Sequence, residues 1–170
     1  MQGVSRSFDE QSPPYATGEE VCGIFQRDMH HLYALSFLLT ANHVLAEKCF
    51  VQSLDDLPEG DPVFGEGAQS RVSWTIARNA IQISRPRPGD NLKERPYADD
   101  TGLDHPAEFA AVVGLPGFER FVFVLSLLER YTDQESSHLL NCSVDDVVKA
   151  RAKALQSIVQ YDKRVSVEED

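Results

Sequence analysis

The sequence has little of what a secreted or membrane-bound protein needs. Only three cysteines occur in 170 residues, and an odd number at irregular spacing does not form a disulfide framework. No charged and then apolar leader opens the chain. The longest uncharged apolar stretch, around residues 32–44, is interrupted by polar residues and is shorter than the roughly 20 residues that span a bilayer. We therefore expect a cytoplasmic protein without a membrane span.

Positive charge is also scarce, with 16 Lys and Arg against 27 Asp and Glu and a net charge of -11. A protein that binds nucleic acid over a wide surface normally carries a basic field. The composition therefore excludes wide, non-specific DNA binding. Residues 118–158 are nearly balanced, with five basic and six acidic residues, so much of the excess acid lies outside this segment.

Patterns that carry catalysis or bind metals are missing as well. His138 and Cys142 stand four residues apart, but no further Cys or His falls at a spacing that would complete a zinc site. The pairs Asp55–Asp56 and Asp99–Asp100 lie beside turn residues, without a neighbouring base or a Gly-rich cradle. We expect no catalytic residues, no metal and no cofactor.

No segment shows a convincing strand pattern, whereas helical periodicity recurs along the chain. Apolar residues at helical spacing predict a long helix from Thr17, a second helix capped by Asn42 and running to about Leu57, and a third over residues 68–83. Five prolines between Pro86 and Gly117 indicate an acidic linker. We expect a short helix near residues 107–113 within it, and a further helix over residues 118–128.

These segments predict an all-α fold of two small helical lobes joined by an acidic, Pro-rich linker. The predicted parts are a flexible tail over residues 1–17, a first lobe over 18–85, the linker over 86–114, a second lobe over 115–161 and an acidic tail over 162–170.

The second lobe carries the spacing of a helix-turn-helix. Thr132 is followed three residues later by Glu135, and Ser143 by Asp146, so each pair can form a capping box. Asn141, between them, can adopt the left-handed conformation that ends a helix. The helix after Ser143 has an apolar face and also carries Lys149, Arg151 and Lys153, as expected if one side packs and another contacts a partner.

In this order, the features resemble those of bacterial RNA polymerase sigma factors of the extracytoplasmic-function type, within the sigma-70 family. In the second lobe, Leu115–Pro116, the apolar run 121–128, Leu139–Leu140, Ser143–Val144 and Ala154–Leu155 are similar to the module that reads the promoter minus-35 element. In the first lobe, segments within residues 32–47 look like the polymerase-docking helices. Residues 74–79 resemble the helix that reads and melts the minus-10 element. The resemblance covers nearly all of residues 20–158.

The resemblance implies a regulator of transcription initiation whose partners are core RNA polymerase and promoter DNA, with an anti-sigma factor as a further partner. The large aromatic Trp74 could stack on an extruded base, but we interpret it as a core residue, because such side chains mostly pack. The implied polymerase contacts are Leu32, Tyr33, Leu35, Ala46, Glu47 and Phe50. The implied DNA contacts are Ser143, Lys149, Arg151, Lys153, Arg71, Arg78 and Asn79.

The chain also departs from the family pattern. After Ala46–Glu47, where the family has an acidic docking motif, it has Lys48 and Val51. On the predicted recognition helix, Val148 and Ala150 stand where the family usually places Lys and Arg. With the acidic net charge, these departures leave an alternative open: a sigma mimic that binds an anti-sigma factor or another protein partner without binding DNA.

Overall fold

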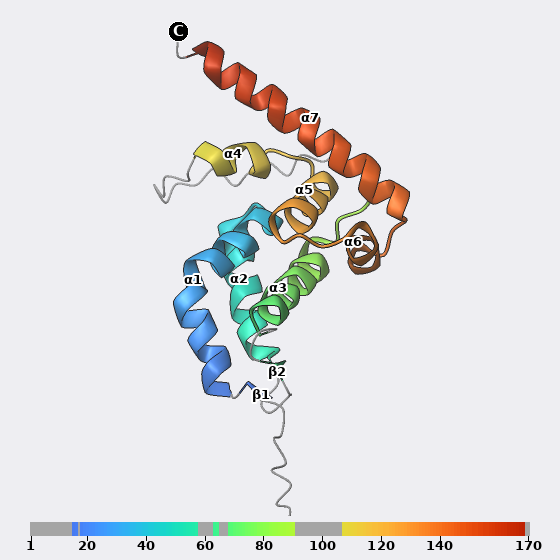
Figure 1. The fold of residues 1–170 in the computed structure, drawn as a ribbon. Coiled ribbons are helices and arrows are strands. Elements are labelled where there is room, and N and C mark those ends of the chain that lie inside the picture. Colours follow the sequence, from blue (N-terminus) through green and yellow to red (C-terminus); the bar gives the residue numbers. More distant parts are fainter. Residues whose placement is uncertain (1–14, 17, 58–62, 65–67, 91–106, 169–170) are drawn as a thin grey trace, which may run out of the picture.

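The described part of the chain is helical, as predicted, except for one pair of two-residue strands (Figure 1). The computed structural model describes residues 15–16, 18–57, 63–64, 68–90 and 107–168. Most of the predicted tail 1–17 and of the linker 86–114 therefore lies outside the described residues, as does Thr17. The helices are α1 (Gly18–Thr40), α2 (His43–Asp55), α3 (Ala68–Ser84), α4 (Ala107–Val113), α5 (Gly117–Phe123), the π-helix η2 (Val124–Leu128), α6 (Asp133–Leu140) and α7 (Val144–Glu168).

The strand pair was not predicted. β1 (Tyr15–Ala16) and β2 (Val63–Phe64) pair antiparallel, with Tyr15 opposite Phe64 and Ala16 opposite Val63. A strand of two residues is too short to show the alternation of apolar and polar residues by which strands are recognised in a sequence.

Helices α1, α2 and α3 pack on one another and form an N-terminal bundle. Helix α1 is kinked at Asp28, whose φ of -105° and ψ of 16° are not helical. The predicted cap of α2 is confirmed, because the Asn42 side chain accepts a hydrogen bond from the Leu45 amide at 3.0 Å. The buried apolar residues of this bundle include Leu32, Leu35, Leu39, Ala46, Cys49, Val72, Ile76, Ala77 and Ala80.

Helix α5 joins the C-terminal helices to this bundle. It packs on α1, and its buried residues Phe118 and Phe121 belong to the same apolar cluster as the core of α1, α2 and α3. The fully buried Arg120 donates from Nε to the Leu39 carbonyl at 3.3 Å and from Nη1 to the Leu115 carbonyl at 3.2 Å. The two predicted lobes thus contact each other, and their buried residues form one cluster.

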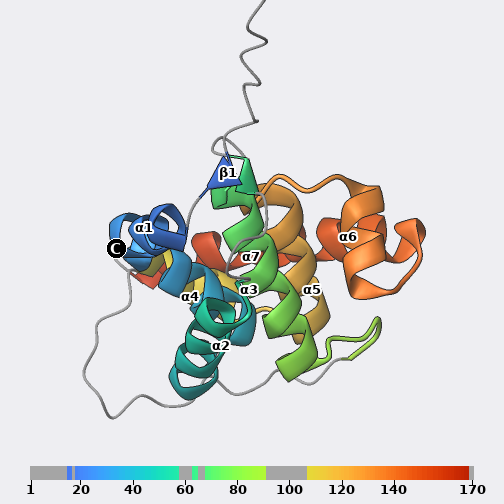
Figure 2. The ribbon, with the colours of Figure 1, turned by 90° about the horizontal axis from the view of Figure 1, so that it is seen from below.

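The helix-turn-helix geometry is present in α6 and α7. Thr132 and Glu135 form the predicted capping box, and the Asp146 amide donates to Ser143 Oγ at 3.1 Å while the Ser143 amide donates to Asp146 Oδ2 at 3.1 Å. Asn141 is left-handed, with a φ of 50° and a ψ of 51°. Seen from below, α6 stands beside α5 while α7 passes behind α3 and α5 (Figure 2).

Two helix boundaries differ from the prediction. The predicted helix 118–128 changes to π-helical geometry at Val124, and the Glu129 amide donates to the Val124 carbonyl at 3.0 Å. Helix α7 continues to Glu168, through most of the predicted acidic tail over residues 162–170. No Gly or Pro occurs from Val144 onward to stop it.

Candidate nucleic-acid interface

The exposed face of α3 carries arginines and the single tryptophan of the chain. Arg71, Trp74 and Arg78 are exposed, and their spacing of three and four residues places them on one side of the helix. The opposite side packs into the bundle through Val72, Ile76 and other buried residues. Packing of the apolar side therefore determines which side chains α3 presents to a partner.

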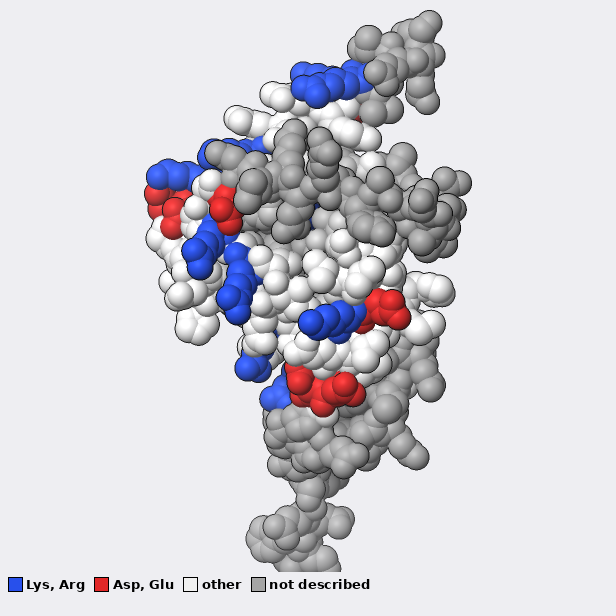
Figure 3. All heavy atoms as spheres, turned by 180° about the vertical axis from the view of Figure 1, so that it is seen from behind, with Lys and Arg blue, Asp and Glu red and all other residues white. Residues whose placement is uncertain are grey.

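The segment around α3 is free of acidic residues. Between Glu66 and Asp90 the sequence contains four arginines and no Asp or Glu. Arg85 and Arg87, just after the end of α3, are exposed as well. In the view from behind, several Lys and Arg side chains lie down the left side of the molecule, and the Asp and Glu atoms form small groups beside them and elsewhere on this face (Figure 3). Local positive charge is thus available despite the net charge of -11.

Trp74 is not a core residue, contrary to our interpretation of the sequence. Its side chain is 41% exposed, because it lies on the outer side of α3. The Arg78 guanidinium carbon is 5.6 Å from the centroid of the indole ring, within the range of a cation–π interaction. The pair presents a flat aromatic surface next to a permanent positive charge.

A hollow of about 420 Å³ lies beside Trp74, between α3 and α6. Most of its exposed lining is apolar, and Gln134 and His138 offer groups that can donate or accept hydrogen bonds. Its size is within the range of small-molecule pockets, about 300–1,000 Å³. Its lining residues are Trp74, Tyr131, Gln134, Glu135, His138 and Leu139.

Two ionisable groups in this hollow have shifted pKa values. Burial, reinforced by the charges of Glu129 and Glu135, raises the pKa of Tyr131 to about 12, so Tyr131 stays neutral at physiological pH. The backbone and side chain of Thr132 donate hydrogen bonds to the Glu135 carboxylate and lower its pKa. The Glu135 carboxylate serves to cap α6, and the remaining polar groups of the hollow are neutral or histidine.

Asn79 does not face a partner, in contrast to its predicted role as a DNA contact. It is 2% exposed. Its side-chain amide donates to Ser53 Oγ at 3.1 Å and to Asp56 Oδ2 at 3.0 Å. Asn79 therefore ties α3 to the end of α2, and Arg71 and Arg78 are the predicted contacts of this helix that remain at the surface.

Three of the predicted polymerase contacts are also core residues. Leu32, Leu35 and Ala46 are 0%, 2% and 0% exposed, so they cannot touch a partner in this conformation. Of the others, Glu47 is exposed, whereas Tyr33 and Phe50 are half-buried and pack edge to face, with ring centroids 6.3 Å apart. The Tyr33 hydroxyl also forms a hydrogen bond with His43 Nδ1 at 3.0 Å.

The predicted DNA contacts of α7 are largely engaged within the chain. Lys149 pairs with Asp145 at 2.5 Å, and Arg151 forms an ion pair with Asp133 of α6. Ser143 caps α7, and Lys153 is exposed. Ala150, which departs from the family pattern, is 4% exposed and packs in the core, whereas Val148 is 42% exposed.

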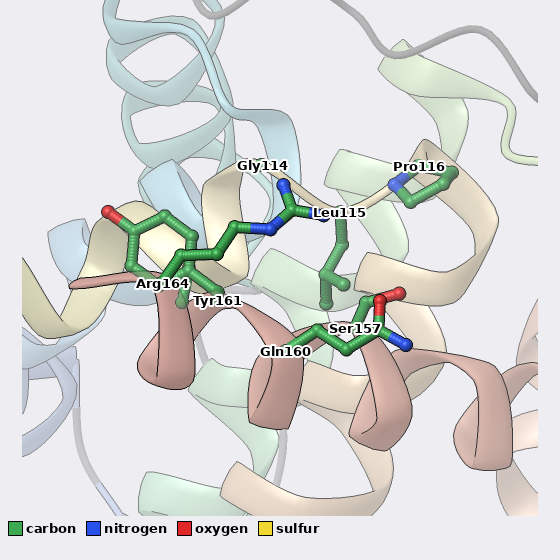
Figure 4. Close-up of a pocket in the computed structure, with 8 residues that line it drawn as sticks. Gly114, Leu115, Pro116, Ser157, Gln160, Tyr161 and Arg164 are labelled. Atoms are coloured by element: carbon green, nitrogen blue, oxygen red, sulfur yellow. The ribbon is translucent and has the colours of Figure 1, made fainter. Parts of the chain in front are cut away.

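A second hollow, of about 200 Å³, lies where the second half of α7 crosses the connection between α4 and α5. Polar side chains of α7 face Gly114, Leu115 and Pro116 here, and the Arg164 guanidinium lies over the Gly114–Leu115 backbone (Figure 4). Beyond Ala154, α7 thus turns polar residues toward this connection, while Ile158 still packs against the core. The α7 residues that line this hollow are Ser157, Gln160, Tyr161 and Arg164.

Sequence reasoning missed the exposed Arg85 after α3, and Tyr131 and Gln134 in the hollow beside Trp74. The signal for Arg85 was the acid-free run of residues, which is visible without a structure. Tyr131 and Gln134 meet Trp74 only through the packing of α6 near α3, which no local pattern reveals.

Within the described ranges, no cluster of three or more His, Cys, Asp or Glu residues could hold a metal ion. None of the described helices combines the length and apolar character required to cross a bilayer. Comparison with protein-family models, with curated proteins and with solved structures finds no match for this chain.

Proposed function

We propose that this protein is a sigma-factor-like regulator of transcription initiation that binds core RNA polymerase and promoter DNA, and that α3 binds a single DNA strand. The observation that carries this proposal is the exposed Trp74 between Arg71 and Arg78, on a segment without acidic residues. The helical order and the corner between α6 and α7 support the resemblance to sigma factors on which the partners depend.

The physical basis is stacking combined with local charge. A base stacked on an aromatic side chain contributes about 1–3 kcal/mol to binding, and all four bases can stack in this way. The neighbouring guanidinium groups attract the phosphates of the same strand. Acidic residues elsewhere on the molecule repel DNA, so binding is confined to α3 and the hollow beside it, and occupancy of a promoter requires tethering by the polymerase.

The hollow between α3 and α6 extends this contact. Trp74 forms one wall, and Gln134 and His138 lie on the other side with hydrogen-bonding groups. An unstacked base can enter only after the duplex has opened. Binding here would therefore favour the melted promoter over the closed one, and no covalent chemistry is needed.

Transcription from a pool of promoter fragments with core RNA polymerase tests this function. The wild-type protein should start transcripts on a subset of the fragments, and the double variant Arg71→Ala/Arg78→Ala should reduce their yield at least tenfold. Lys163→Ala is the matched control, because it removes an exposed positive charge far along α7. Transcripts that do not depend on the protein, or that are unchanged in the arginine variant, would refute the proposal.

The ion pairs of Lys149 and Arg151 favour a second candidate, the sigma mimic that binds a protein partner without DNA. This second function predicts that core polymerase subunits do not co-purify when the tagged protein is isolated from its host. Retention of polymerase subunits supports the first function and contradicts the second.

A further inference from the structure

Helix α7 carries an apolar stripe on its exposed side. Val144, Val148, Leu155 and Val159 are 41%, 42%, 43% and 53% exposed, and Ala152 between them is exposed too. Their spacing of four, four, three and four residues places all five on one side of the helix. At about 1.5 Å per residue, the stripe is roughly 22 Å long.

This stripe is separate from the side by which α7 packs. Val147, Ala150 and Ala154 are 0%, 4% and 0% exposed, and α7 contacts mainly α5, with α6 and α4 alongside. A surface helix needs one apolar side for its own core. A second, continuous apolar side that stays exposed is typical of an interaction surface.

The stripe is poorly suited to DNA. Valine and leucine side chains offer no hydrogen bonds to phosphates, and base edges are read mainly through hydrogen bonds, apart from contacts with the thymine methyl group. The two basic residues nearest its start, Lys149 and Arg151, are paired with Asp145 and Asp133. A protein surface fits the stripe better than a duplex does.

The charges along the stripe indicate the partner's chemistry. Lys153 is exposed within the length of the stripe, and Lys163 and Arg164 are exposed just beyond its end at Val159. Asp145 is paired with Lys149, which leaves Asp162 as the other exposed acidic residue between residues 144 and 164. In a symmetric pair of α7 helices, two surfaces with the same surplus of positive charge would meet, which disfavours a second copy of this chain as the partner.

We propose that the α7 stripe binds an amphipathic helix of another protein, with apolar residues along the seam and Asp or Glu residues along the flank that faces the lysines of α7. This is the helix-on-helix mode of peptide recognition, in which anchors recur every three or four residues. The inference does not depend on whether α3 binds DNA.

A selection from displayed 20-residue helical peptides tests the proposal, using the full-length protein as bait. Selected peptides should carry apolar residues every three or four positions, with acidic residues beside them. The variants Val148→Glu and Leu155→Glu should each weaken peptide binding at least tenfold. Val51→Glu is the matched control, because Val51 is 49% exposed on α2 and lies outside the stripe.

Circular dichroism and thermal unfolding of each variant establish that it folds, as expected for side chains that are already half-exposed. Selected peptides with basic flanks, peptides that bind Val148→Glu as well as wild type, or a selection without any enriched helical pattern would overturn the proposal. So would loss of duplex DNA binding in Val148→Glu with no loss of peptide binding.

Discussion

Arg120 shows how a single side chain holds distant segments together. It is fully buried, yet it donates hydrogen bonds to the carbonyls of Leu39, at the end of α1, and Leu115, before α5. A buried guanidinium is tolerated only when its donors are satisfied. Arg120 thus connects the N-terminal bundle to the C-terminal helices by hydrogen bonds and not by packing alone.

Replacing Arg120 by Met should lower the free energy of unfolding by about 2–4 kcal/mol, because two buried carbonyls lose their donor. Urea denaturation measures the change. Lys153→Met, at an exposed site on α7, should change stability by less than about 0.5 kcal/mol. Equal effects of the two substitutions would show that Arg120 does not join the helices.

Cys49 should resist alkylation in the folded protein. Burial raises the pKa of its thiol to about 11, and only the thiolate reacts with iodoacetamide. At pH 8, mass spectrometry should find Cys49 unmodified until urea unfolds the chain. Rapid labelling of Cys49 in the native protein would contradict its placement between α2 and α3.

At the scale of elements, the two capping boxes hold the ends of α6 and α7. Thr132 lowers the pKa of Glu135 through its backbone and side-chain hydrogen bonds, and Ser143 lowers the pKa of Asp146 in the same way. A carboxylate whose pKa is lower in the folded state adds stability above its unfolded pKa. That stability is lost as the pH falls through the folded pKa.

The double variant Glu135→Gln/Asp146→Asn should therefore unfold at a lower temperature than wild type at pH 7. The carboxyls of the unfolded chain titrate near 4.5 and 3.8, so the difference should shrink as the pH falls below about 4. Scanning calorimetry across this range measures it. A difference as large at pH 2 as at pH 7 would exclude the capping carboxylates as its source.

The helices could be predicted well where the signal is local. The caps at Asn42, Thr132 and Ser143 and the left-handed Asn141 depend on neighbouring residues, and the structure shows all four. The strand pair, the π-helical turn at Val124 and the length of α7 could not be predicted, because tertiary packing or the absence of a stop signal determines them.

The candidate site was less predictable. The helical pattern of α3 identified a basic helix, but it could not tell Trp74, which is exposed, from Asn79, which is buried. Both residues lie on a helix whose packed side is set by α1 and α2. Similarly, Leu32, Leu35 and Ala46 were assigned to polymerase binding through the resemblance, and the bundle buries them.

At the scale of the whole molecule, the buried residues of both predicted lobes form one cluster. We predict a single cooperative unfolding transition, because α5 contributes to the same core as α1 and α3. Trp74 fluorescence reports the N-terminal bundle and circular dichroism reports all helices, so urea curves from both should coincide. Two separated transitions would show that the lobes are stable independently.

For DNA binding, the distribution of charge over the molecule matters more than the net charge. Acidic residues outnumber basic ones in the chain as a whole, yet every charged side chain between Glu66 and Asp90 is positive. Such segregation allows one helix to attract a nucleic acid strand while the rest of the molecule repels it.

The most direct test of this central claim is a fluorescence titration of the protein with single-stranded DNA, in which Trp74 is the only tryptophan. Stacking of a base on the indole predicts quenching that saturates, and Arg71→Ala/Arg78→Ala should weaken binding at least tenfold with a shallower salt dependence. Fluorescence that does not change with DNA, or an equal response in the arginine variant, would contradict the account.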